Sequence, residues 1–306
     1  MIKTIPMNLL FVLFFLTASL VLGEPNFRGQ FYEQFNRGDF REMERTLKAW
    51  KAECQDDVEM LAAYGSYYFN QSKRGKAANP AKLTAREEIL LSGGSPETND
   101  AGPDPEARFD RKGLARAADY WKKAVFLYPG RMDIRFWLAR AYQDMDNFEA
   151  QYQTLAEALQ YADKNKKKLR WNNNENLPDR RSQFIPETMQ DFEAYYFARQ
   201  QKASDEKAFR LAKLTLTFYP NHPSAYNSMA AYYSYRQDWE HTLKYLILAS
   251  QRDPQDSLVL NNIGNILMRL DKKKEAAVYY KKVVEMGADG KSVEHAKRKL
   301  EVLNGF

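Results

Sequence analysis

Two consecutive stretches decide the fold of this chain: PSAYNSMAAYYSYRQDWEHTLKYLILASQRDPQD at 223–256 and SLVLNNIGNILMRLDKKKEAAVYYKKVVEMGADG at 257–290. Aligned at an offset of 34 residues, their large, small and turn positions coincide. The aligned pairs are Tyr226 with Leu260, Ala230 with Gly264, Tyr233 with Leu267, Thr242 with Ala276, Leu246 with Tyr280, and Pro254 with Ala288. A fixed period of this length indicates a repeat architecture, in which each unit stacks on its neighbours.

The period and its positions resemble the tetratricopeptide repeat family. The first copy carries that pattern at Tyr226, Met229, Ala230, Tyr233, Trp239, Leu246, Ala249 and Pro254. The second carries it at Leu260, Ile263, Gly264, Leu267, Ala276, Tyr280 and Val283. The resemblance implies an all-α fold, a right-handed α-solenoid of helix hairpins.

Weaker copies of the same pattern precede these two. About six hairpins are expected, at 24–57, 58–130, 132–163, 184–221, 223–256 and 257–290. A final helix over 291–303 is strongly polar on one side, as is typical of a helix that caps the end of a stack. The sequence predicts one α-solenoid over 24–306 after a signal peptide at 1–23.

Two insertions interrupt the period, at 71–112 and 164–183. The first is rich in Gly, Pro, Asn and Asp, and Thr84 with Glu87 forms a capping-box pattern that predicts a short helix inside it. Loops of this length are usually functional or disordered. We therefore expect the features that are specific to this protein, including its function, to depend on these two insertions.

The N-terminal segment is typical of a secretory signal peptide. Lys3 provides a short basic region, and Leu9–Leu22 is an apolar run of 14 residues. This run is shorter than the roughly 20 residues of a membrane-spanning helix. We expect export to the periplasm or cell envelope of a bacterium, with an uncleaved membrane anchor as the alternative. Cys54, the single cysteine, excludes an intrachain disulfide.

No catalytic or metal-binding motif is recognisable. The histidines His222, His241 and His295 are far apart, and one cysteine cannot build a cysteine-based zinc site. The net charge of +6 would suit anionic partners, but positive and negative residues are mixed along most of the chain. We therefore predict no enzymatic activity, no cofactor and no metal.

The resemblance implies a concave groove lined by the first helix of each hairpin. The residues that correspond to groove positions are Phe136, Arg140, Asn227, Asn261, Asn265 and Arg269. Asn and Arg side chains could hold a peptide through its backbone and carboxylates. Asn265 also belongs to the repeat consensus, so the fold alone can explain its presence.

A basic run in the second insertion is the other candidate. It consists of Lys166, Lys167, Lys168 and Arg170, followed by Trp171. Such a run could bind nucleic acid, but the predicted export argues against that partner. Contact with anionic lipid headgroups or an acidic protein is the better functional interpretation. A solvated end of the preceding helix is the structural alternative.

These features favour a protein–protein interaction scaffold that binds a protein or peptide in the groove. The rival is an enzyme or small-ligand-binding protein whose site is formed by the 71–112 insertion over the groove. The identity of the partner and the oligomeric state stay open at this point.

Overall fold

The computed structural model describes residues 26–72, 110–166, 168–172, 175–176, 181–287 and 290–304. They divide into two compact units, one ending at Tyr128 and one beginning at Pro129. The expected signal peptide at 1–23 and the interior of the first insertion lie outside the described residues. None of the described helices is long and apolar enough to cross a membrane.

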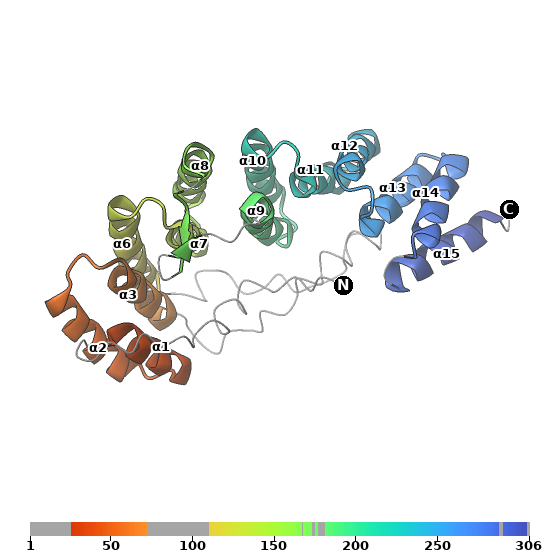
Figure 1. Cartoon of the computed structure of the whole chain (residues 1–306). Helices are drawn as coiled ribbons and strands as arrows, with labels where there is room; N and C mark the ends of the chain where they lie inside the picture. Colours follow the sequence, from red (N-terminus) through yellow and green to blue (C-terminus); the bar gives the residue numbers. More distant parts are fainter. Residues whose placement is uncertain are drawn as a thin grey trace. The chain divides into compact units, whose positions relative to one another are not determined.

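The first unit contains two helix pairs (Figure 1). They are α1 (Phe27–Arg37) with α2 (Phe40–Glu53), and α3 (Val58–Gln71) with α6 (Arg111–Leu127). α3 and α6 pair across the first insertion because its ends meet: the Asp110 amide donates to the Ser72 carbonyl at 2.7 Å. Ser72 is itself buried at this junction. The insertion therefore leaves and re-enters the repeat at one point.

The second unit contains four further pairs and a final helix. The pairs are α7 (Met132–Asp144) with α8 (Phe148–Lys164), α9 (Arg181–Phe197) with α10 (Lys202–Phe218), α11 (Pro223–Tyr235) with α12 (Trp239–Arg252), and α13 (Ser257–Arg269) with α14 (Lys273–Glu285). The final helix is α15 (Gly290–Asn304). The predicted all-α fold of stacked helix pairs is confirmed.

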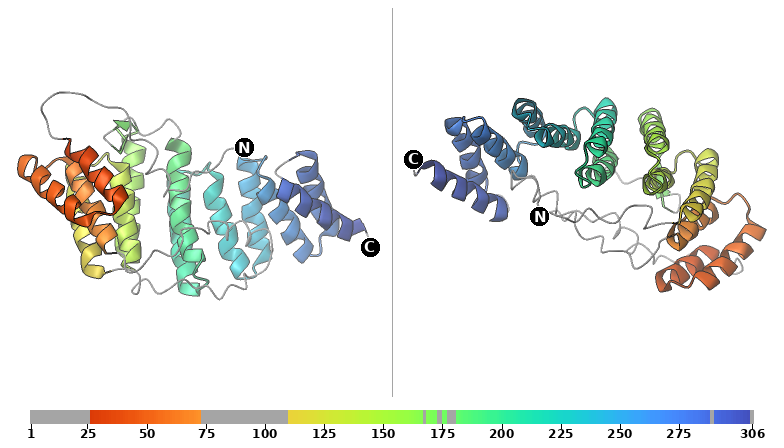
Figure 2. Two further views of the ribbon diagram at one scale, coloured as in Figure 1. Left: turned by 90° about the horizontal axis from the view of Figure 1, so that it is seen from below. Right: turned by 180° about the vertical axis from the view of Figure 1, so that it is seen from behind.

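Within the second unit, α9 contacts α11, α13 contacts α15, and α8 contacts α10. First helices and second helices thus form two separate layers (Figures 1 and 2). We call their outer surfaces the first-helix face (α7, α9, α11, α13 and α15) and the second-helix face (α8, α10, α12 and α14).

Local sequence sets the ends of these helices. Asp57 accepts a hydrogen bond from the Met60 amide at 2.7 Å, and Asp256 accepts from the Val259 amide at 3.0 Å, so each caps the helix that follows. The turn between the helices of a pair needs a residue with positive φ. In five of the pairs that residue is Gly38, Asp146, Gln200, Gln237 or Asp271.

A small residue facing a large ring fixes the packing within a pair. A Cβ atom added to Gly65 would lie 2.1 Å from Nε1 of Trp121, and one added to Gly264 would lie 2.5 Å from Cε1 of Tyr280. Both rings are buried. This is the structural basis of the alternation of small and large positions in the repeat.

The second insertion contains a short hairpin of β1 (Arg170–Trp171) and β2 (Glu175–Asn176), in which Arg170 pairs with Asn176. The helix after it, α9, begins at Arg181 and contains Pro186. A proline has no N–H to donate to the carbonyl four residues earlier, so α9 lacks one intrahelical hydrogen bond near its start.

Candidate interaction surfaces

The predicted groove residues differ widely in accessibility. Asn261, Asn265 and Phe136 are buried, with Asn261 0% and Phe136 3% exposed. Arg140 and Asn227 are half-buried, and Arg269 is exposed. The structure therefore separates three side chains that serve internal packing from three that reach the surface.

Asn261 and Asn265 hold the final helix, α15, in place through polar contacts. Nδ2 of Asn261 donates to the Ser292 carbonyl of α15 at 3.0 Å. Oδ1 of Asn265 accepts from the Tyr280 hydroxyl at 2.8 Å and lies 3.2 Å from Nε2 of His295. Burial raises the pKa of Tyr280, so this phenol stays protonated and donates. Burial also lowers the pKa of His295, with Lys299 and Arg298 adding to the effect.

Phe136 is covered by the second insertion. The ring of Trp171 lies 6.3 Å from the ring of Phe136 and packs edge-on against Phe184 at 4.7 Å. The groove candidate and the last residue of the basic run are thus neighbours, although no periodicity in the sequence links them.

The described residues of the basic run differ in their surroundings. Lys166 pairs with Asp163 at 3.6 Å, Lys167 lies outside the described residues, and Lys168 is exposed. The backbone amide of Arg170 donates to the Gly130 carbonyl at 2.8 Å, which ties β1 to the start of α7. The alternative of a solvated helix end is wrong for residues 169–171, because α8 ends at Lys164 and Leu169 is buried.

The two arginines of the predicted groove already have neighbours. Nε of Arg140 lies 3.2 Å from Asp144, and the side chain keeps 36% of its surface exposed. The Arg269 guanidinium lies 4.7 Å from the centre of the Trp239 ring, a cation–π contact between α13 and α12. Both could exchange these contacts for a ligand.

Asn227 is the exception among the amides. It occupies the position in α11 that Asn261 occupies in α13, 34 residues later. Its side chain makes no hydrogen bond within the described part of the chain. Its Oδ1 atom is buried, and its Nδ2 atom donates no hydrogen bond to the described residues. The amide that binds a main-chain carbonyl in the repeat of α13 is thus unbonded at the equivalent position of the preceding repeat.

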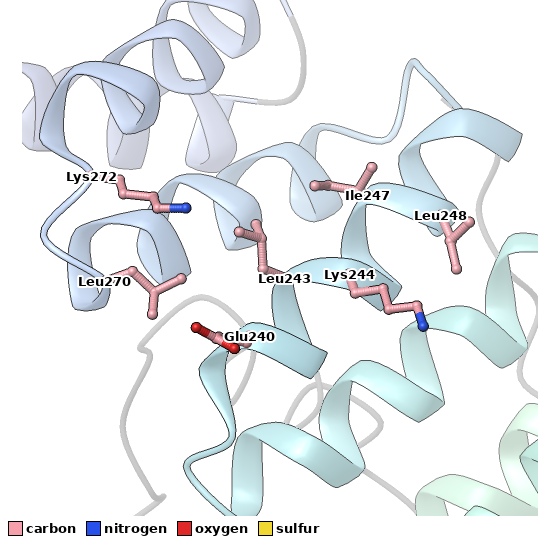
Figure 3. Close-up of a pocket in the computed structure, with 7 residues that line it drawn as sticks. All are labelled: Glu240, Leu243, Lys244, Ile247, Leu248, Leu270 and Lys272. Carbon is pink, nitrogen blue, oxygen red and sulfur yellow. The ribbon is translucent and has the colours of Figure 1, made fainter.

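A second surface lies on the second-helix face. A groove of about 600 Å³ runs between α12 and the turn from α13 to α14 (Figure 3). We call it the α12 groove, and its lining residues are Glu240, Leu243, Lys244, Ile247, Leu248, Leu270 and Lys272. None of these residues was predicted from the sequence to line a binding surface. The available signal was α12 itself, which carries aliphatic residues on more than the one face that packs in the core.

Among the described residues there is no group of three or more His, Cys, Asp or Glu side chains arranged to hold a metal ion. Cys54 is a free, exposed thiol. The rival site over the first insertion falls on residues that are not described, apart from its two ends.

Comparison with known proteins gives one sequence match and several distant structural ones. Residues 258–287 match the family model described as the tetratricopeptide repeat. No curated protein matches the sequence.

Three solved structures represent the structural similarities. MamA from Desulfovibrio magneticus RS-1 is 15% identical, with 59% of this chain and 89% of that chain covered and a TM-score of 0.34. YrrB, described as a tetratricopeptide-repeat protein with an unusual peptide-binding site, is 12% identical, with 82% and 97% covered and a TM-score of 0.40. PilF from Pseudomonas aeruginosa is 13% identical, with 89% and 96% covered and a TM-score of 0.37.

Similarities of this size carry no argument about function. The matched segment begins one residue into α13 and ends just past α14, so it coincides with one complete helix pair. Residues 258–287 thus resemble a tetratricopeptide repeat, and the helix pairs that precede them have the same two-helix arrangement.

Proposed function

We propose that the chain is a non-enzymatic scaffold that binds a segment of a partner protein on its first-helix face. The repeat family supports this class of function, because stacked helix pairs present extended surfaces for protein partners. Arg140, Asn227 and Arg269 are the accessible members of the predicted groove, and we assign them to the binding surface.

The observation that carries the proposal is the unbonded amide of Asn227. Its equivalent Asn261 donates to the main-chain carbonyl of Ser292, so this position of the repeat has the geometry to bind backbone. Asn227 has no such partner within the described residues. An extended peptide offers carbonyls of the same kind, and a hydrogen bond to its backbone would hold it largely independently of its sequence.

The test compares Asn227→Ala with Asn221→Ala in the full-length protein. Asn221 is an exposed asparagine in the turn before α11 and serves as the matched control. Photo-crosslinking in native cells, followed by mass spectrometry, identifies a discrete partner of the wild type. Affinity for that purified partner should fall about fivefold in Asn227→Ala, as expected for loss of roughly 1 kcal/mol. Equal affinities of the two variants would refute the assignment of Asn227.

We further propose that the protein acts in the bacterial cell envelope. The apolar run Leu9–Leu22 behind Lys3 supports export. Cell fractionation combined with N-terminal sequencing distinguishes a cleaved signal from a retained anchor. Recovery of the full-length protein in the cytoplasm would contradict the proposal.

A further inference from the structure

The α12 groove has an apolar floor that the described part of the chain leaves open. Leu243, Ile247 and Leu248 from α12, with Leu270 from the turn between α13 and α14, are all half-buried. Three of them also pack against the buried cluster below, so the floor is held in place. Its volume falls within the range of about 300–1,000 Å³ that is typical of ligand sites.

The rim of this groove is charged. Lys272 reaches from the turn toward α12 above Leu243, and Lys244 and Glu240 stand along α12 (Figure 3). None of the three makes an ion pair within the described residues, whereas the adjacent Lys273 lies 3.9 Å from Asp271. The rim thus has one net positive charge available to a ligand.

These two features define the chemistry of the occupant. Aliphatic side chains match the floor, and a neighbouring carboxylate matches the lysines at the rim. None of the described residues that line the groove is aromatic, so they offer no platform for stacking nucleic-acid bases. A peptide fits the lining better than a nucleic acid.

We propose that the α12 groove is a second binding site, which takes a short segment of a partner protein with aliphatic side chains next to acidic residues. This site goes beyond the proposed function on the first-helix face, because it lies on the other layer of the unit. It shares no residue with the surface of Arg140, Asn227 and Arg269. The two surfaces could therefore hold two partners, or two segments of one partner, at the same time.

The test measures fluorescence anisotropy with full-length protein and labelled ten-residue peptides. The probe contains leucine and glutamate; one comparison peptide replaces glutamate by lysine, and another replaces leucine by serine. The wild type should bind the probe at least tenfold more tightly than either comparison peptide. Equal binding of all three peptides, or no binding of the probe at millimolar concentration, would overturn the proposal.

Single substitutions test whether the probe binds in the α12 groove. Lys272→Glu should weaken binding of the probe at least tenfold and improve binding of the lysine peptide, whereas Lys273→Glu serves as the matched control and should leave both unchanged. Leu248 lies outside the buried cluster, so the Leu248→Ser variant should fold normally. This variant should also bind the probe more weakly than the wild type. An unchanged affinity in Lys272→Glu and Leu248→Ser would exclude this groove.

The variant Asn227→Ala separates this proposal from the preceding one. It should bind the probe as the wild type does, since Asn227 does not line the α12 groove. Loss of probe binding in Asn227→Ala would contradict a separate site. Failure to crosslink a partner on the first-helix face leaves the peptide result intact.

Discussion

At the scale of single residues, Gly264 fixes how closely α13 and α14 approach. A side chain at this position would meet the buried ring of Tyr280, which cannot move away because its hydroxyl donates to Asn265. Gly65 and Trp121 repeat the arrangement in the first unit. The two helices of a pair can thus approach closely because glycine has no Cβ atom at this position.

We predict that Gly264→Ala lowers the free energy of unfolding by about 1–3 kcal/mol, the usual cost of overpacking a core. Gly290→Ala is the control, because Gly290 also lies in a helix but has no atom within 4 Å of an added Cβ. It should be neutral or slightly stabilising, since alanine is the better helix former. Urea denaturation followed by circular dichroism measures both. Equal stabilities would show that the Tyr280 ring can shift.

The packing of Gly264 against Tyr280 could be predicted from the sequence alone, because both residues fall on positions that recur at the 34-residue offset. The hydrogen bonds of Asn261 and Asn265 to α15 could not be predicted in this way. The repeat register tells on which side of a helix a residue lies, but not which later helix covers it. Here α15 covers both amides, and α15 has no helix after it in the described chain to complete a pair.

At the scale of elements, α15 is attached in part through a histidine. His295 packs near Asn265 and Tyr280, with Lys299 and Arg298 on its own helix. Burial, followed by these two cations, lowers the pKa of His295 below 6.5. The folded state therefore binds the proton less tightly than the unfolded chain. The stability that neutral His295 contributes is therefore fully present above about pH 6.5. It is lost as the pH falls through the lowered pKa of His295 in the folded state.

We predict that hydrogen-exchange protection of α15, corrected for the intrinsic rate, decreases as the pH is lowered from 7 to 5. His295→Gln should remove most of this pH dependence, because glutamine does not titrate. The control is His222→Gln: burial also lowers the pKa of His222, but this residue caps α11 and does not contact α15. If His222→Gln abolished the effect in α15 and His295→Gln did not, the assignment would be wrong.

The hairpin of the second insertion is an element that no repeat pattern could place. Its residues break the period, so the sequence gives no register for them, and Trp171 is recognised as a packing residue only from its contacts with Phe136 and Phe184. The α12 groove was missed for a related reason. Repeat positions predict what is buried within a pair, whereas the groove lies beside the turn of the next pair.

We predict that Trp171→Ala lowers the free energy of unfolding by about 2–3 kcal/mol. This is less than the roughly 3–5 kcal/mol for a fully buried aromatic side chain, because Trp171 is half-buried. Lys168→Ala, an exposed neighbour in the same run, should change it by less than about 0.5 kcal/mol. Thermal and urea unfolding measure both. A neutral Trp171→Ala would mean that the hairpin does not contribute to the stability of the unit.

At the scale of the molecule, the second unit contains two hydrophobic clusters that follow one another along the chain. One draws its buried residues from Met132 to Leu214, the other from Ala230 to Ala296. They are joined through contacts of α11 with α9 and α10. In a repeat architecture, stability is approximately a sum over units and their nearest-neighbour interfaces. A defect in one cluster should therefore weaken the other only through the interface at α11.

Leu155→Ala and Leu260→Ala form a matched pair for testing this coupling. Both leucines are almost fully buried, one in each cluster, and each substitution should cost about 2–5 kcal/mol. We predict that Leu155→Ala raises hydrogen exchange mainly in α7 to α10, and that Leu260→Ala raises it mainly in α12 to α15. The reason is that local unfolding is confined to one cooperative region of the structure. Peptide-resolved hydrogen-exchange mass spectrometry measures both patterns. If either substitution raised exchange equally from α7 to α15, the unit would unfold as one block, and the nearest-neighbour description would not apply to it.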